Sequence, residues 1–192
     1  LLASLSPIVD CGVHYLDVMC QITQSKPLSV SAIGVRLSDE IPKDNYNYGQ
    51  LQIRFEDDSV GWYEAGWGPM ISETAFFVKD VIGPNGSVSI VSDDDTFNKD
   101  SDNIENHTKN NCLKIHSSKL DSDDNFISPN KKIVYNEDPS HQDLCDYEQE
   151  YFYKSISENI DLKSHMEDAY KSLQIALACD EAVKKGKTVF LD

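Results

Sequence analysis

The chain has 192 residues, of which 40% are hydrophobic and 26% charged, and its formal net charge is −16. This length and composition are typical of a soluble globular protein with one domain and a real hydrophobic core. An acidic surface repels phosphate backbones and anionic lipids, and no apolar run reaches the roughly 20 residues that a membrane-spanning helix needs. Nucleic-acid binding and membrane insertion are therefore not expected.

The chain begins at Leu1 rather than at a methionine, and residues 1–3 lack the charged leader and cleavage pattern of a signal peptide. We therefore expect a fragment of a longer cytoplasmic protein. The five cysteines are odd in number and none forms a C-x-x-C pair. This pattern predicts reduced, mostly buried thiols, and neither a disulfide framework nor a zinc site.

The first predicted element is a helix over residues 7–23. Ser6 is a plausible N-cap, and Pro7 suits the first helical position. Gly12, inside this helix, costs about 1 kcal/mol relative to alanine in an exposed helix, which indicates that another part of the protein packs against the backbone there. The apolar residues at helical spacing are Val9, Val13, Leu16 and Cys20.

Beyond this helix the hydrophobic period changes to two, which predicts strands. The polar residues 56–58 and the run Gly83–Gly86 are expected to form turns. Strands that follow one another through short turns form an antiparallel sheet, and helices can cover only its apolar face. The predicted strands are residues 29–35, 50–55, 59–65, 74–82 and 87–91.

Residues 92–140 are rich in acidic and turn-forming residues and are expected to be a surface insertion of solvated loops. Two short apolar alternations, residues 113–116 and 132–135, predict further strands. Helical spacing returns over residues 142–159 and 162–185, and the second of these helices is expected to end at Gly186. Residues 188–191 predict a short final strand.

One part of the insertion copies the start of an EF-hand calcium loop, with Asp121, Asp123 and Asn125 at alternate positions. Phe126 stands where that loop needs glycine, and Lys132 stands where it needs a bidentate glutamate. We therefore do not expect a calcium site.

The chemistry of the chain points to Asp10, His14 and Asp17. On a helix, residues four apart lie about 40° apart around the axis, so the Asp10 carboxylate can accept a hydrogen bond from one ring nitrogen of His14. That bond would fix the tautomer and raise the basicity of the other nitrogen. A histidine so held suits removal of a proton from a substrate hydroxyl while hydride leaves the same carbon.

Spacing alone also fits other interpretations of these three residues. The pair Asp10 and His14 is also typical of a helix surface without catalytic function. One imidazole and two carboxylates are suitable metal ligands, but three ligands within two turns of one helix rarely converge on one ion. No metal ligand is therefore assigned.

Residues 10–17, which read D-C-G-V-H-Y-L-D, resemble the D-x-G-x-H-x-x-D segment that opens the second domain of the Gfo/Idh/MocA oxidoreductase family. Residues 81–88 resemble a sheet turn of that family, and residues 166–189 resemble its last helix and strand. These matches occur in order and span nearly the whole chain apart from about residues 92–140.

The resemblance implies an α+β fold with a large open-faced, predominantly antiparallel sheet backed by helices on one side. Residues 1–192 would form a single substrate-binding and oligomerisation domain, with the acidic insertion at about 92–140. The family's enzymes use NAD or NADP to oxidise sugars, inositols and related polyols, and often form dimers or tetramers through the exposed sheet face. By resemblance His14 is the general base, Asp10 its orienting carboxylate, and Asp17 a residue that holds the helix.

The sequence departs from the family in lacking G-x-G-x-x-G after a strand and the E-K-P segment whose lysine completes the catalytic group. Both belong to the family's first domain, which we expect before Leu1, so no cofactor-binding residue is assigned and the chain alone is expected to be inactive. The alternative is a non-catalytic assembly or ligand-binding domain that keeps the same sheet.

An aromatic stretch, Trp62, Tyr63 and Trp67, allows two interpretations. The rings could stack on a sugar, or they could pack beneath helices or at a subunit interface, and we favour packing. His141 and His165 begin the two late helices and are expected to be surface histidines.

Overall fold

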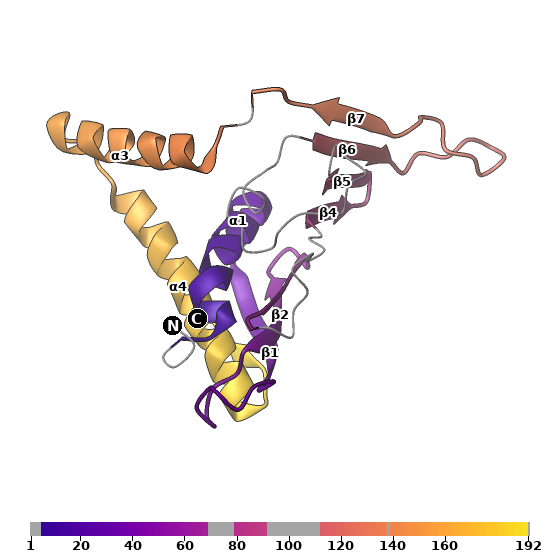
Figure 1. Ribbon diagram of the computed structural model, residues 1–192. Helices are drawn as coiled ribbons and strands as arrows, with labels where there is room; N and C mark the ends of the chain where they lie inside the picture. Colours follow the sequence, from indigo (N-terminus) through magenta and orange to yellow (C-terminus); the bar gives the residue numbers. More distant parts are fainter. Residues whose placement is uncertain (1–4, 69–78, 92–111, 138, 192) are drawn as a thin grey trace. The chain divides into compact units, whose positions relative to one another are not determined.

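The computed structural model describes residues 5–68, 79–91, 112–137 and 139–191. The chain divides into two compact units, the first formed by residues 1–71 and 160–192 and the second by residues 72–159. The named strands all pair antiparallel and accompany helices, which confirms the α+β class (Figure 1). These strands form two four-stranded sheets, one in each unit.

The first unit opens with the predicted helix, but its first turn is π-helical. This turn, η1 (Ile8–Gly12), continues directly into α1 (Val13–Thr23). The Ser6 hydroxyl accepts a hydrogen bond from the Val9 amide at 3.3 Å, which satisfies one of the unpaired donors of the helix start. The other helix of this unit, α4 (Lys163–Lys185), ends at Gly186 in the left-handed conformation, as predicted.

The sheet of the first unit has the strand order β3-β2-β1-β8. It confirms the strands predicted at residues 29–35, 50–55, 59–65 and 188–191, with shifted ends. Its strands are β1 (Pro27–Val35), β2 (Tyr48–Phe55), β3 (Val60–Gly66) and β8 (Val189–Phe190).

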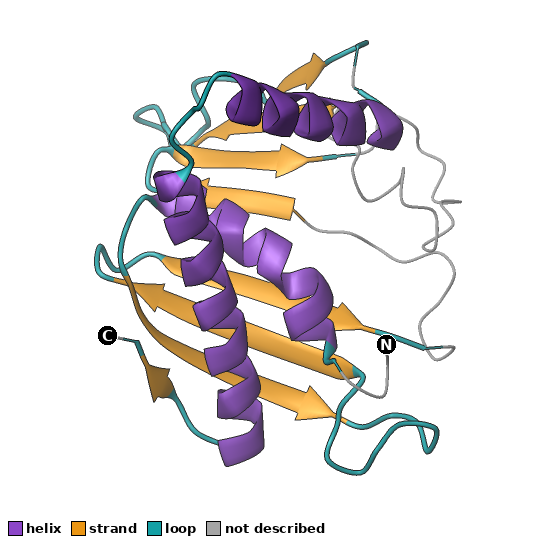
Figure 2. Cartoon of the chain, turned by 90° about the vertical axis from the view of Figure 1, so that its left-hand side faces the viewer, coloured by secondary structure: helices purple, strands orange, loops and turns teal. Residues whose placement is uncertain are grey.

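Both helices of the first unit cover the same face of this sheet (Figure 2). Along β2, Leu51, Ile53 and Phe55 are buried beneath the helices, while Gln52 and Arg54 between them are exposed. The alternation in the sequence therefore matches the two faces of the strand. The free energy gained by burying these apolar side chains is the main contribution that holds the helices and the sheet together.

The opposite face of this sheet, which neither described helix of the first unit covers, carries both apolar and polar side chains. Gln52 pairs with Ser31 on one side and with Trp62 on the other, so the three lie in one row across three strands. The large apolar residues exposed on these strands are Ile33, Val35, Val60, Trp62 and Phe190.

The second unit contains a sheet of order β4-β5-β6-β7 and the helix α3 (His141–Ser157). A capping box starts α3. These strands confirm the ones predicted at residues 87–91, 113–116 and 132–135. They also confirm the described end of the strand predicted at 74–82; its residues 74–78 lie outside the described part. The strands are β4 (Lys79–Gly83), β5 (Gly86–Ile90), β6 (Cys112–Ser117) and β7 (Lys131–Val134).

The segment that copies an EF-hand start is a tight turn closed by one carboxylate. Asp121 Oδ1 accepts hydrogen bonds from the Asp123 amide at 2.9 Å and the Asn125 amide at 3.0 Å. These backbone bonds lower the pKa of Asp121. The carboxylate therefore shapes the turn, as expected for a polar loop. The two other acidic runs, residues 93–95 and 99–102, lie outside the described residues.

All five cysteines are free, but only Cys112 and Cys179 are buried, whereas the sequence predicted that most of them would be. Cys179 is fully buried in the core of the first unit, where burial raises its thiol pKa to about 12. Cys112 is fully buried in the second unit. Among the described helices, none combines the length and apolarity that crossing a bilayer requires.

A polar link ties the loop before β2 to α4. The Tyr46 hydroxyl donates to Asp180 Oδ1 at 2.7 Å, and Lys184 Nζ lies 2.8 Å from Asp180 Oδ2. Burial raises the Asp180 pKa, but hydrogen bonds from Lys184, Tyr46 and Ser6 outweigh it, so that the pKa lies below its ordinary value.

This link predicts a pH-dependent contribution to stability. Because folding depresses the Asp180 pKa, the contribution is complete above the unfolded value of about 4 and is lost as pH falls through the folded pKa. The free energy of unfolding, measured with urea, should fall less between about pH 5 and pH 3 in the Asp180→Asn variant than in the unchanged protein. Tyr46→Phe should reduce the same loss in part. Identical pH slopes in all three proteins would contradict the role of this link.

Candidate functional site

The two predicted catalytic residues lie on one continuous helical segment. Asp10 is half-buried in η1, and His14 is exposed in the first turn of α1. Within the described residues no hydrogen bond joins the two side chains. The expected bond between them requires α-helical spacing throughout, whereas a π-turn bonds residue i to i+5 and changes the rotation between the two positions. Single π-turns inside α-helices are frequent at functional sites.

The Asp10 carboxylate instead interacts with its neighbour Cys11, whose thiol donates to Asp10 Oδ2 at 3.5 Å. Burial and the Asp10 carboxylate both raise the Cys11 pKa, and a hydrogen bond from the Trp67 side chain lowers it in part. Trp67 immediately follows β3. The carboxylate and the thiol therefore form one contact at this end of the helix.

A pair of tyrosines packs beside this group. The Tyr15 and Tyr63 rings stack with centroids 5.1 Å apart. Gly12 makes room for the Tyr63 ring, because a Cβ there would lie 3.1 Å from Tyr63 Cε1. The close approach that the glycine predicted is confirmed, and Tyr63 packs beneath the helix as favoured. Burial, first, and the nearby Cys11, Tyr15 and Asp10 raise the Tyr63 pKa.

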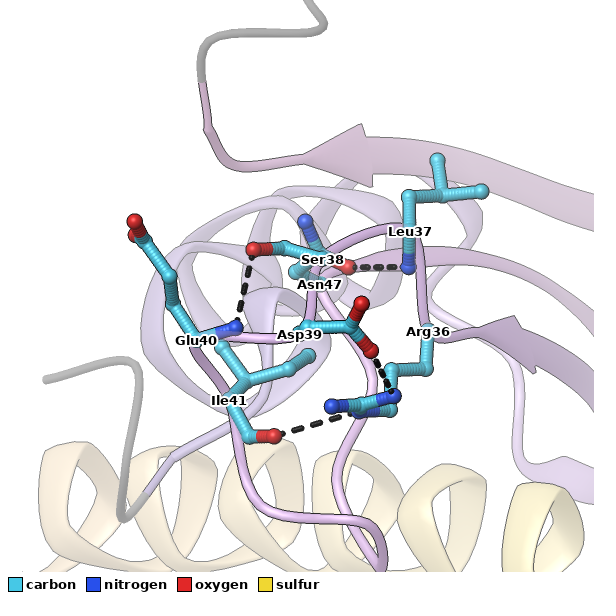
Figure 3. A network of polar contacts seen from close by, with 7 residues as sticks. All are labelled: Arg36, Leu37, Ser38, Asp39, Glu40, Ile41 and Asn47. Atoms are coloured by element: carbon cyan, nitrogen blue, oxygen red, sulfur yellow. Dashed lines mark hydrogen bonds and ion pairs between the residues drawn. The ribbon is translucent and has the colours of Figure 1, made fainter.

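Asn47 fixes the backbone around Trp67, and it is fully buried. Its side-chain amide donates to the Trp67 carbonyl at 2.7 Å, and the Trp67 amide donates to the Asn47 carbonyl at 2.7 Å. Its side-chain oxygen accepts from the Leu37 amide at 2.7 Å (Figure 3). Nothing in the sequence predicts this role of Asn47, because an asparagine between two tyrosines carries no signal of burial.

The loop that Asn47 joins, residues 36–47, is braced by a second set of contacts (Figure 3). Arg36 donates from Nε to the Ile41 carbonyl at 3.1 Å and from Nη1 to Asp39 Oδ1 at 2.9 Å. The Ser38 hydroxyl accepts from the Glu40 amide. These local bonds shape the loop on both sides of the Asn47 contact.

Asp17 takes the structural role that the resemblance implied. The buried Ser172 hydroxyl of α4 donates to Asp17 Oδ1 at 2.9 Å, which joins α1 to α4. A shallow hollow of about 210 Å³ lies at Asp17, on the α4 side of α1, and not at His14. It is lined by Asp17, Cys20, Gln21, Gln24, Asp168 and Lys171.

We expect Ser172→Ala to lower the free energy of unfolding by about 1–2 kcal/mol, because it removes a buried donor to a charged group. Urea unfolding of the purified protein measures this change. The replacement Ser164→Ala, on the exposed first turn of the same helix, is the matched control and should have an effect within about 0.5 kcal/mol. Equal effects of the two substitutions would contradict the proposed helix contact.

The other histidines considered from the sequence lie elsewhere. His141 begins α3 in the second unit, with its Nε2 3.6 Å from Cys145 Sγ. His165 is exposed in the first turn of α4. Across the described ranges, no three His, Cys, Asp or Glu side chains are grouped to hold a metal ion.

The described residues do not fit a dinucleotide. Dinucleotide crevices open at the carboxyl ends of parallel strands, beside a glycine-rich turn. The strand pairs of both sheets here are antiparallel. A nicotinamide cofactor would therefore need most of its binding site from another part of the protein.

Solved structures share this fold. An aldose-aldose oxidoreductase from Caulobacter crescentus, complexed with glycerol, aligns with a TM-score of 0.66 and 16% identity over 96% of this chain and 47% of its own. A levoglucosan dehydrogenase in complex with NADH and levoglucosan aligns with a TM-score of 0.67 and 16% identity, over 95% of this chain and 49% of its own. An oxidoreductase from Agrobacterium radiobacter in complex with NAD⁺, L-tartaric acid and magnesium aligns with a TM-score of 0.64 and 13% identity. This alignment covers 95% of the present chain and 48% of the Agrobacterium chain.

At these identities the likeness establishes the fold and not the substrate. The chain spans about half the length of each of these structures. No curated protein sequence matches it significantly.

The family model for the C-terminal alpha/beta domain of the oxidoreductase family matches residues 6–191, which is nearly the whole chain. This match covers the helix with Asp10 and His14, both sheets and the final strand. The chain therefore belongs to the Gfo/Idh/MocA oxidoreductases, as their C-terminal domain.

Proposed function

We propose that this chain is the substrate-binding and assembly half of an NAD- or NADP-dependent dehydrogenase that oxidises a sugar or polyol. The family supports an oxidoreductase, and two structural neighbours are an aldose-aldose oxidoreductase and a levoglucosan dehydrogenase. Because the chain spans about half of these neighbours, the dinucleotide-binding half is expected in the rest of the full-length protein.

The observation that carries the proposal is the exposed His14, one helical turn from the half-buried Asp10. A nicotinamide held mainly by the rest of the full-length protein would supply the hydride acceptor for the substrate carbon. His14 takes the proton of the hydroxyl on that carbon, so that an alcohol becomes a carbonyl. The Asp10 carboxylate stabilises the imidazolium that forms, through a hydrogen bond that closes when substrate binds or through its charge alone.

The surroundings of His14 suit a neutral, hydroxylated substrate. Tyr15 and Tyr63 form a packed aromatic pair, and Trp67 lies beside Cys11. Aromatic faces complement the C–H faces of sugar rings, and half-buried polar groups give a small substrate its orientation. In this proposal Trp67 forms a wall of the substrate site and Tyr63 supports it from beneath.

The test is nicotinamide reduction by the full-length protein with a panel of inositols, hexoses and sugar acids, measured with both NAD⁺ and NADP⁺. Turnover with at least one member supports the dehydrogenase proposal and identifies the cofactor. If the protein binds a nicotinamide dinucleotide but oxidises no member of the panel, the proposal is wrong for this substrate class.

A second role, assembly, is favoured by the open face of the first sheet. Its exposed large side chains, among them Trp62 and Phe190, leave apolar surface on strands that helices cover only from behind. We propose that this face joins two or four copies of the chain. Light scattering of the full-length protein and of Trp62→Glu tests this role, and an unchanged mass in the variant would oppose it.

A further inference from the structure

We propose that the outward face of α1 and α4 is the surface on which the dinucleotide-binding half of the full-length protein docks. The choice of this partner rests on the proposed function, and every residue of the face belongs to the first unit. The outward face carries two apolar stripes, Val18 and Ile22 on α1 and Met166, Tyr170, Leu173 and Leu177 on α4.

The stripe on α4 points away from the core of its own unit. Each residue of an α-helix advances about 100° around the axis, so the four stripe residues fall within about 60° of one another. The buried residues of α4, among them Ile175 and Cys179, lie on the opposite side of the helix and pack in the core. The stripe residues are between 43% and 67% exposed. Thus α4 has two apolar faces, and the described part of the chain covers only one of them.

The stripe on α1 is in line with the candidate base. His14, Val18 and Ile22 follow one another at four-residue spacing, and all three are exposed. Leu16, on the opposite side of α1, is fully buried in the core. The two helices lie side by side over one face of the sheet, so both stripes face outward together (Figure 2). A partner that covers the stripes therefore also meets His14.

The position of His14 indicates which partner covers this face. In the proposed reaction the hydride acceptor must lie against the carbon whose hydroxyl His14 deprotonates. The described residues do not fit a dinucleotide, and the chain spans about half the length of its structural neighbours. The half that holds the nicotinamide therefore has to approach the helix face that carries His14. This face is also the apolar one, which is the surface expected at a contact between two domains.

The extent of the outward face favours a half of the same protein over a second copy. The stripe on α4 runs from Met166 to Leu177, about 17 Å, and two packed helices are about 20 Å wide. A contact of these dimensions buries about 350 Å² on this side and about 700 Å² when both partners are counted. Stable complexes of separate proteins bury about 1,200 Å² or more, whereas contacts between domains of one chain begin at about 600 Å². A covalent link supplies the effective concentration that so small a contact needs.

The docking is tested without any assay of turnover, by hydroxyl-radical oxidation of the full-length protein read by peptide mass spectrometry. Met166 is 67% exposed in the described structure, so slow oxidation requires that another part of the protein covers it. Leu173→Glu combined with Leu177→Glu should raise the oxidation rate of Met166 about tenfold, because buried charges lower the docked fraction. Met19, which packs against the core of the same unit, is the internal control and should keep its rate.

The matched control is Phe152→Glu combined with Ile156→Glu, an exposed apolar pair at the same spacing on α3 in the second unit. It should leave the oxidation of Met166 unchanged. Fast oxidation of Met166 in the unchanged protein, or equal effects of the two double variants, would overturn the docking. Light scattering identifies a different occupant. If the α4 double variant has half the mass of the unchanged protein, a second copy covers the face and the inference is wrong.

Turnover separates this inference from the proposed function. The α4 double variant should lose kcat about tenfold or more and keep dinucleotide binding, because His14 no longer meets the cofactor. Turnover in a protein whose Met166 is oxidised freely would keep the proposed function and refute the docking. Protection of Met166 in a protein that binds the dinucleotide but oxidises no substrate would refute the proposed function and support the docking.

Discussion

Replacing His14 with asparagine in the full-length protein is expected to lower kcat by about 10²- to 10⁴-fold, the usual contribution of a positioned general base. Asparagine keeps a polar side chain of similar reach but cannot accept and hold a proton near neutral pH. His14 is exposed and makes no hydrogen bond with Asp10 in the described structure, so the substitution should leave stability within about 0.5 kcal/mol. Dinucleotide binding, measured by fluorescence, should survive.

The matched control is His165→Asn, since His165 is also an exposed histidine in the first turn of a helix of the same unit. We expect its kcat to stay within about twofold of the unchanged protein, because surface substitutions rarely affect distant chemistry. A His14→Asn variant that keeps full turnover would exclude His14 as the base and would favour the assembly role.

The largest effect on stability is expected at Gly86, which closes the turn between β4 and β5. Its φ is +139°, a conformation that residues with side chains rarely adopt, and a Cβ there would lie 1.9 Å from the carbonyl oxygen of His116. That oxygen belongs to the backbone of β6, so it cannot move without breaking the strand pairing. We expect Gly86→Ala to destabilise the second unit by about 3 kcal/mol or more.

Gly83, at the other end of the same turn, provides the control, because a Cβ there meets nothing within 4 Å. Gly83→Ala should change stability by less than about 1 kcal/mol. Hydrogen exchange of the β5 and β6 amides measures the stability of both variants within the second unit. A measurement of global unfolding would mix this effect with the stability of the first unit. Equal protection in the two variants would show that the backbone at Gly86 tolerates a side chain.

The parts of the fold that the sequence predicted well are those with a clean local pattern. The alternation ending at Phe55 placed β2, and Gly186 marked the end of α4. The start of β1 was missed at Pro27, because proline lacks the N–H of a ladder and the pairing there is irregular. The start of α3 was predicted one residue late, although Ser140 and Asp143 carry the signature of a capping box.

The candidate site was predictable only in part, and the limit is physical. Asp10 and His14 lie close in sequence, so a short motif could point to both. The π-turn leaves no clear trace in hydrophobic spacing, because it shifts the helix by one residue over one turn. The contacts of Asn47 and Trp67 depend on how distant strands and loops meet, which no local pattern records.

The two buried cysteines have a practical consequence for studying this chain. Cys179 lies in the core of the first unit and Cys112 in the second, and both are inaccessible in the folded state. Each unit therefore contains its own native reporter of opening, since a thiol reacts with reagent only when its surroundings unfold. Labelling both sites under mild denaturant would reveal whether the halves of this domain open together or one before the other, with no added probe.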